Sequence, residues 1–271
     1  MTYCVGLRLD AGLVFLSDSR TYAGVDHINT FRKMHFFQRS NERVVVLMTA
    51  GNLSITQSVV NTLGERMDSD RQMNLNTVPN MFEAAKHVGD CLREVHARDA
   101  GPLKDFGVDF SSGLILGGQI KGERPRLFNI YSAGNFIEAT PETPYFQIGE
   151  SKYGKPIIDR VINSLTSLEE AAKCALISMD SSIRSNLSVG MPLDLLIYER
   201  DALQIAHHCV IREDSAYYAQ IRKLWSMRLK ESFTELPRPD WDNIHLTAEV
   251  LRQESVQNTQ RQQTRGENRE N

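Results

Sequence analysis

The stretch TYCVGLRLDAGLVFLSDSR, residues 2–20, decides the fold. Two apolar runs, Tyr3 to Leu9 and Leu13 to Ser17, flank a short turn that contains Gly12. This pattern is typical of a β-hairpin, in which a glycine allows the tight reversal between two antiparallel strands. The chain therefore begins as antiparallel sheet.

The rest of the chain alternates between pairs of strands and pairs of helices. Apolar residues four apart predict a helix after Asn52 and another after Asn80, where Glu83 supplies a capping signal. The predicted elements are strands at 3–9, 13–17, 33–38 and 44–48, two helices after Asn52 and Asn80, strands at 113–118 and 126–131, helices at 153–165 and 168–183, strands at 193–198 and 203–209, and a helix at 215–230.

This order predicts an α+β fold, a four-layer α-β-β-α sandwich with two antiparallel sheets between helical layers. We expect one domain over residues 1–250, with a C-terminal helical extension from about residue 212. Residues 252–271 contain five Gln and three Asn but one apolar residue, Val256. Because such a segment cannot bury enough apolar surface to fold, we expect a disordered tail over 251–271.

The composition is that of an ordinary soluble protein. The 271 residues are 41% hydrophobic and 24% charged with a net charge of −3, which indicates neither a nucleic-acid nor a membrane partner. No apolar run approaches the roughly 20 residues of a membrane span, and no signal peptide is evident. The four scattered cysteines indicate reduced thiols and a cytoplasmic location. The histidines show no metal-ligand spacing, so we expect no metal and no cofactor.

Thr2 is the first candidate for chemistry. It follows the initiator Met1, and a small second residue favours removal of that methionine. Removal would leave a hydroxyl and a free α-amine on one residue, which is a nucleophile that carries its own base. An α-amine has a reference pKa of about 7.7–8.0, so part of it is neutral at physiological pH and can accept a proton.

Further motifs make the pattern specific. With Thr2, the motifs Asp18-Ser19-Arg20, Lys33 and Thr49-Ala50-Gly51 resemble the start of a proteasome β-subunit, an N-terminal-nucleophile (Ntn) hydrolase of α-β-β-α fold. Residues 26–28 (Asp-His-Ile) and 149–156 (Gly-Glu-Ser-Lys-Tyr-Gly-Lys-Pro) are similar to the bacterial Anbu (ancestral beta subunit) group of that family. The resemblance covers roughly residues 2–210.

The resemblance implies a role for each matching residue. Thr2 matches the nucleophile, Lys33 the lysine beside its hydroxyl, and Asp18 the carboxylate that orients this lysine. Arg20 matches a supporting residue, and Gly51 matches the glycine whose N–H helps to form the oxyanion hole. Elementary chemistry agrees, because a buried lysine needs an acidic partner and a glycine lets a carbonyl approach its N–H closely.

The second half departs from the family pattern. Where the family has Gly-Ser-Gly, this chain has Gly149-Glu150-Ser151, so the expected serine is either replaced by Glu150 or shifted to Ser151. Where an aspartate is typical, the chain has Ser185, while the serine at Ser188 fits. These serines are candidates for contacts with the amine and a catalytic water. The missing aspartate affects the expected rate more than the mechanism.

The resemblance also implies substrates and partners. Residues Thr21, Phe31, Thr49 and Leu53 are expected to line the first specificity pocket and to favour an apolar or modest-sized side chain. Peptides or proteins are the expected substrates, and the chain is expected to assemble with itself as a ring or an open helical array. The chain has no phosphate-binding glycine pattern, so we do not expect it to hydrolyse ATP itself. The resemblance leaves room for a separate unfoldase.

Three readings of the function follow. The leading one is a self-assembling threonine-type peptidase that acts through Thr2. The second is an Ntn amidase that cleaves a small non-peptide amide. The third is a non-catalytic assembly subunit, although the presence of Asp18 and Lys33 argues against it.

Overall fold

The structure is a computed structural model that describes residues 2–22, 28–67, 73–205 and 207–240. The chain divides into two compact units, residues 1–225 and 226–271. The expected disordered tail, 251–271, lies outside the described residues.

The first unit contains two five-stranded sheets, and every strand pair in them is antiparallel. The first sheet has the order β10-β1-β2-β11-β12, formed by β1 (Tyr3–Leu9), β2 (Gly12–Asp18), β10 (Tyr145–Gly149), β11 (Leu193–Glu199) and β12 (His207–Ile211). The second has the order β5-β6-β7-β8-β9, formed by β5 (Met34–Arg39), β6 (Arg43–Gly51), β7 (Ser112–Ile120), β8 (Arg126–Ile130) and β9 (Phe136–Glu138). A two-stranded ribbon joins them in sequence, β3 (Arg20–Tyr22) with β4 (Ile28–Thr30).

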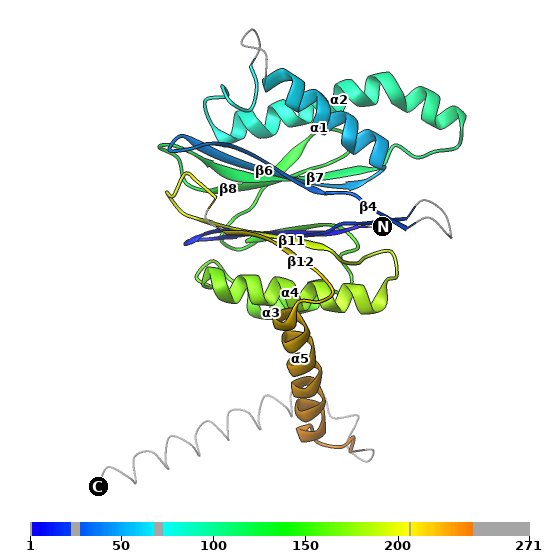
Figure 1. The fold of residues 1–271 in the computed structure, drawn as a ribbon, viewed down its shortest axis with the longest axis vertical. Helices are drawn as coiled ribbons and strands as arrows, with labels where there is room; N and C mark the ends of the chain where they lie inside the picture. Colours follow the sequence, from blue (N-terminus) through cyan, green and yellow to red (C-terminus); the bar gives the residue numbers. More distant parts are fainter. Residues whose placement is uncertain (1, 23–27, 68–72, 206, 241–271) are drawn as a thin grey trace. The chain divides into compact units, whose positions relative to one another are not determined.

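Two pairs of helices cover the outer faces of these sheets (Figure 1). The helices α1 (Leu53–Met67) and α2 (Met81–Asp105) pack on the second sheet, and α3 (Lys155–Val161) and α4 (Leu168–Ser185) pack on the first. The result is the predicted four-layer α-β-β-α sandwich with two antiparallel sheets between helical layers.

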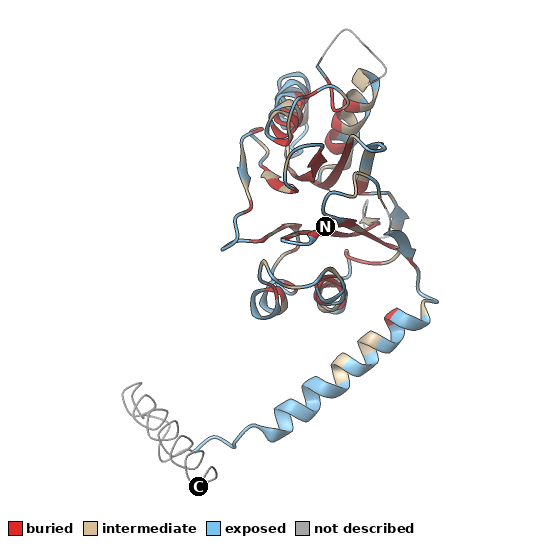
Figure 2. Cartoon of the chain, turned by 90° about the vertical axis from the view of Figure 1, so that its left-hand side faces the viewer, coloured by how far each residue is buried: buried red, intermediate tan, exposed pale blue. Residues whose placement is uncertain are grey.

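Three apolar clusters hold the layers together, one between the sheets and one under each helical pair. The alternation of side chains along a strand divides β1 between them, because Tyr3 and Val5 face the helices α3 and α4 while Cys4 faces the other sheet. Figure 2 shows the buried residues gathered in the sheets and on the helix faces against them. Since the strand alternates in this way, Thr2 belongs to the same side as Cys4.

Capping residues fix the start of the helices that the sequence predicts. The Ser167 side chain accepts the N–H of Glu170 and the Glu170 side chain accepts the N–H of Ser167, which completes a capping box at α4. Asn80 caps α2 by accepting the N–H of Glu83 at 2.8 Å. These contacts satisfy backbone donors that a helix start otherwise leaves unpaired.

Some boundaries differ from the prediction. Helix α3 spans Lys155–Val161 instead of 153–165, because Ile162 takes an extended conformation that ends it. The strand expected at 203–209 is β12, displaced to His207–Ile211. The short strands β3, β4, β9 and β10 were not predicted, and β10 matters most because it pairs with β1 beside Thr2.

The C-terminal helix α5 (Ala216–Glu235) has Tyr218 as its buried residue. Near its start, Arg222 Nε donates to Asp180 Oδ1 of α4 at 2.5 Å, and Asp180 is itself buried. Arg184 Nε also donates to this carboxylate, at 3.2 Å. None of the described helices has the length and apolar character that a membrane crossing requires.

The cysteines give a direct test of this packing. Cys4, Cys91 and Cys174 are buried and Cys209 is exposed, and burial raises the pKa of Cys91 and Cys174 to about 11. We expect one thiol per native chain to react with Ellman's reagent at pH 8 and four to react in denaturant. The thiols of the unfolded chain ionise at about pH 8.5, below the raised pKa of Cys91 and Cys174 in the folded chain. The free energy of unfolding should therefore fall as the pH rises above about 8.5. Rapid reaction of two or more native thiols would contradict the packing.

Candidate active site

Thr2 lies at the start of β1 and is 7% exposed. Its carbonyl oxygen accepts the N–H of Glu150 at 2.6 Å, one step beyond the pair that Tyr3 forms with Gly149. On the other side, the N–H of Tyr3 donates to Asp18 Oδ1 at 3.0 Å. The backbone around Thr2 is therefore fixed from both neighbouring strands.

Asp18 and Lys33 form a buried ion pair. Lys33 Nζ lies 2.8 Å from Asp18 Oδ1, and Asp18 is 0% exposed while Lys33 is 5% exposed. Burial raises the pKa of Asp18, and the Lys33 ammonium and the N–H groups of Tyr3 and Gly190 oppose that rise. The same carboxylate oxygen thus contacts both Lys33 and the residue that follows Thr2, which links the lysine to the start of β1.

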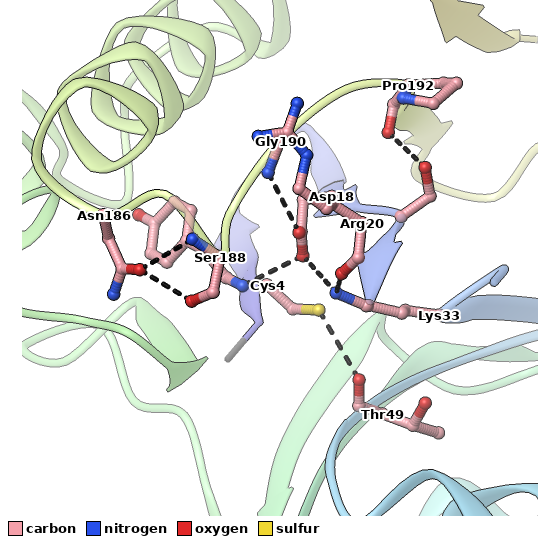
Figure 3. A network of polar contacts seen from close by, with 11 residues as sticks. Cys4, Asp18, Arg20, Lys33, Thr49, Asn186, Ser188, Gly190 and Pro192 are labelled. Carbon is pink, nitrogen blue, oxygen red and sulfur yellow. Dashed lines mark hydrogen bonds and ion pairs between the residues drawn. The ribbon is translucent and has the colours of Figure 1, made fainter. Parts of the chain in front are cut away.

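The loop between α4 and β11 closes over this pair (Figure 3). The Gly190 N–H donates to Asp18 Oδ2 at 3.3 Å. Arg20 contributes twice, because its carbonyl oxygen accepts Lys33 Nζ at 2.6 Å and its guanidinium donates to the Leu187 carbonyl at 3.1 Å. Arg20 therefore acts on the site through Lys33 and through the loop.

A cavity of about 610 Å³ opens beside Thr2. Thr2 and Lys33 lie in its wall together with groups from β6, β7, β8 and β10. Its lining residues are Thr2, Thr21, Lys33, Thr49, Ala50, Gly51, Asn52, Leu53, Thr56, Ser111, Ser112, Gly113, Asn129, Ile130, Tyr131, Ser132, Ile148 and Gly149. Among the described residues, the hydroxyls of Thr21 and Ser112 have no hydrogen-bond partner and are buried there, which suits a ligand that offers polar groups.

Gly51 ends β6 at this cavity with φ +108°. A Cβ at this position would collide with the Ser111 carbonyl, so only glycine fits the backbone here. The cavity wall therefore contains a glycine at the position that the family resemblance assigns to the oxyanion donor.

The cavity brings together six of the twelve predicted site residues, Thr2, Thr21, Lys33, Thr49, Gly51 and Leu53. Asp18 and Arg20 lie behind Lys33, as described above. Phe31 is half-buried and does not line the cavity. Its N–H donates to the Ser19 carbonyl oxygen at 2.9 Å. Its part in a specificity pocket stays a prediction.

The three predicted serines occupy different places. Ser188 donates its Oγ to Asn186 Oδ1 at 2.6 Å in the α4–β11 loop (Figure 3). Ser151 lines a separate hollow of about 420 Å³ with Tyr145 and Lys155. Ser185 is exposed at the end of α4. None of them lines the cavity beside Thr2.

Sequence reasoning missed the part played by Gly149. It has φ +83°, and a Cβ there would collide with the Thr2 carbonyl. The signal was present, because a glycine that closes the alternating run Tyr145–Gly149 can mark a close backbone approach. Gly149 lets β10 pass against the nucleophile candidate.

Gly149→Ala should therefore displace Thr2. We expect the strained φ to lower the free energy of unfolding by about 1–3 kcal/mol. Because the new Cβ pushes the Thr2 carbonyl, we also expect less covalent modification of Thr2 by an active-site reagent. Gly122→Ala is the matched control, since Gly122 has φ +89° with open space around it. Urea unfolding and active-site labelling of both variants measure this, and equal labelling in the two would contradict the account.

Among the residues that the structure describes, no group of three or more His, Cys, Asp or Glu side chains is arranged to hold a metal ion. The site consists of a hydroxyl, a buried lysine paired with a carboxylate, and backbone N–H groups. Nucleophilic attack on a carbonyl requires groups of these kinds.

The four-layer sandwich with Thr2 at the start of an inner strand defines the class as an Ntn-hydrolase fold. The sequence model for the proteasome subunit matches residues 2–197. The chain belongs to the proteasome subunit family.

Its relatives lie in two groups. The proteasome subunit beta of Haloquadratum walsbyi is 24% identical over 209 residues, which cover 76% of this chain and 77% of that protein. The solved structures include Anbu from Yersinia bercovieri, 55% identical with a TM-score of 0.83 over 88% of this chain and 99% of that one. The helical assembly of the Anbu complex from Pseudomonas aeruginosa is 51% identical with a TM-score of 0.85 over 89% and 99%. The resemblance to the Anbu group is thereby confirmed.

Proposed function

We propose that the chain is a threonine-type peptidase in which Thr2, made N-terminal by removal of Met1, attacks a peptide carbonyl. The observation that carries this proposal is the joint position of Thr2, Lys33 and Gly51 around one cavity, with Lys33 held by the buried Asp18. A surface ion pair or a frayed terminus would not have this arrangement.

The steps follow from the groups present. The Thr2 α-amine accepts the proton of Oγ as Oγ bonds to the carbonyl carbon, and the oxyanion forms near the Gly51 N–H. The protonated amine then gives its proton to the leaving nitrogen as the peptide bond breaks. Water, deprotonated by the same amine, hydrolyses the ester and regenerates Thr2. The Lys33 ammonium stabilises negative charge at the threonine oxygen.

The cavity suggests the substrates. Thr21 and Thr49 contribute hydroxyls and Leu53 an apolar surface, while Lys33 is engaged by Asp18. We infer that a peptide with an apolar or modest-sized side chain binds there, its backbone pairing with the polar groups of the wall. A strong preference for acidic side chains would contradict this inference.

We also propose that the chain assembles with itself in the cytoplasm. Large apolar side chains are exposed in the segments that connect the helices and strands, among them Phe106, Leu165 and Leu187. Side chains of this size are available for contacts between copies of the chain, and a related Anbu complex has been solved as a helical assembly. Light scattering on the purified full chain measures its mass in solution, and a monomer at micromolar concentration would contradict assembly.

The test of the peptidase proposal is product analysis. Fluorogenic peptides that differ at one side chain and simple non-peptide amides are incubated with the full chain, and the products are identified by mass spectrometry. We expect the peptides to be cleaved at internal peptide bonds. Cleavage of simple amides alone would favour an Ntn amidase, and no cleavage of either would favour a non-catalytic assembly subunit.

A further inference from the structure

A second acidic residue, Glu150, pairs with Thr2 through its backbone and takes no part in the Asp18–Lys33 pair. Glu150 is 6% exposed, and its N–H donates to the Thr2 carbonyl at 2.6 Å. It follows Gly149, whose backbone is pressed against the same carbonyl. The residue is thus fixed to the start of β1 through its own backbone.

Among the residues that the structure describes, the groups that contact the Glu150 carboxylate are neutral. Oε2 accepts Asn186 Nδ2 at 3.0 Å, and Oε1 accepts the Lys152 N–H at 3.3 Å. Within the described ranges, no lysine, arginine or histidine forms an ion pair with it. A buried carboxylate without a cation is costly, so a cation beside the Glu150 carboxylate would offset that cost.

Asn186 holds this carboxylate in a defined orientation. Its Oδ1 accepts both the N–H of Ser188 at 3.0 Å and the Ser188 hydroxyl at 2.6 Å (Figure 3). The amide is therefore fixed with its Nδ2 toward Glu150. Ser188, a predicted site residue, is linked to the Glu150 carboxylate through Asn186.

Across the strand pairing, the residue that faces Glu150 is Thr2, whose carbonyl oxygen accepts the Glu150 N–H. Thr2 and Glu150 extend the β1–β10 ladder by one residue, and facing residues of such a ladder have Cα atoms about 5.5 Å apart. A glutamate side chain spans that separation. Removal of Met1 converts the Thr2 nitrogen from a neutral amide into an amine that can carry a positive charge.

We propose that the buried carboxylate of Glu150 is the counter-ion of the Thr2 α-amine in the mature chain. The inference deepens the proposed function and rests on it in one respect, that Thr2 becomes the N-terminal residue. Glu150 is then a positioning residue, because it orients the amine that accepts the hydroxyl proton. Asn186 and Ser188 support it from behind.

Other charges near the amine set the direction of the effect. Asp18 on β2 and Lys33 before β5 compensate each other, and the Arg20 guanidinium of β3 is directed to the Leu187 carbonyl. Residues 186–192 of the α4–β11 loop carry no charge. Lys152 is exposed beyond Glu150. Among these described groups, Glu150 is the uncompensated charge, and an anion beside an ammonium raises the pKa of that ammonium.

The test is the pH dependence of labelling at Thr2 by a peptide epoxyketone, measured on the full chain. In Glu150→Gln the amine loses its counter-ion, so its pKa falls and more of it is neutral at low pH. We expect the acidic midpoint of the labelling rate to move down by about one pH unit. Glu150→Asp, which keeps the charge, should return the midpoint toward that of the wild type.

Glu213→Gln is the matched control, because Glu213 is an exposed carboxylate away from the cavity. It should leave the midpoint unchanged. A labelled Glu150→Gln protein with the wild-type midpoint would overturn the inference while leaving the peptidase proposal intact.

A second measurement needs neither catalysis nor a folded variant. Competitive acetylation of the Thr2 amine in the native wild type, followed by mass spectrometry of the N-terminal peptide, gives the pKa of that amine. A value above the reference of about 7.7–8.0 supports the counter-ion, and a value at or below it overturns the inference. If this pKa is raised but no epoxyketone adduct forms, the peptidase proposal fails and the Glu150 contact stands.

Discussion

Thr2→Ala should abolish peptide hydrolysis and leave the fold intact. The substitution removes the only atom proposed to bond to the substrate, so we expect the turnover rate to fall on the order of 10⁴-fold or more, as when other hydrolases lose their nucleophile. Thr2 contributes its backbone to the sheet through the bond to Glu150, and alanine keeps that bond. The measurement is the rate of fluorogenic peptide cleavage together with the thermal midpoint of unfolding.

The control for this variant is Thr30→Ala. Thr30 carries an exposed hydroxyl on β4 and does not line the cavity. Activity within a factor of two of the wild type is expected for it. Full activity in Thr2→Ala would mean that another residue performs the reaction.

Lys33→Met should have the largest effect on stability. It leaves the Asp18 carboxylate buried beside the N–H groups of Tyr3 and Gly190 but without a cation. Removing one partner of a buried ion pair costs about 3–5 kcal/mol in the free energy of unfolding. Labelling at Thr2 should be lost as well, because Lys33 lies in the cavity wall.

The pH dependence of this loss has a defined sign. Without Lys33 the pKa of the buried Asp18 rises further above its value in the unfolded chain, so ionisation of Asp18 opposes folding. The stability deficit of Lys33→Met should therefore be smallest in acid and should grow as the pH rises. Urea unfolding at several pH values measures it.

Two comparisons test the origin of the effect. Lys155→Met removes a lysine from the exposed pair with Asp159, where a loss of less than about 1 kcal/mol is expected. Combining Lys33→Met with Asp18→Asn should cost less than the sum of the single changes, because the uncompensated charge is gone. Additive losses would show that the two side chains act independently.

The parts of the fold that repeat a clear period were predictable. The hairpin of β1 and β2 follows from two apolar runs around a glycine turn, and the buried faces of α1 and α2 follow from apolar residues four apart. The start of α4 follows from Ser167 and Glu170, since capping depends on local sequence alone.

Strand β10 was not predictable in the same way. Its five residues, Tyr145–Gly149, are too few to define a period, and its place beside β1 is set by a contact between residues more than a hundred positions apart. Length and non-local pairing, more than composition, hid this strand.

The site divides along the same line. The first 51 residues supply Thr2, Asp18, Lys33 and Gly51 by motif, and the structure gathers these four at or behind one cavity wall. The second half differs, because the resemblance leads one to expect a carboxylate at Ser185, which is exposed. Glu150 is instead the buried acidic residue, and its backbone pairing with Thr2 follows only once β10 lies beside β1.

The central claim is that Thr2 is a free N-terminal nucleophile, and intact-mass spectrometry before and after incubation with a peptide epoxyketone tests it most directly. That reagent forms its ring adduct only with a hydroxyl and an α-amine on the same residue. The account predicts loss of Met1, one adduct per chain located on Thr2, and no adduct in Thr2→Ala. A chain that retains Met1, or an unmodified chain that begins at Thr2, would contradict it.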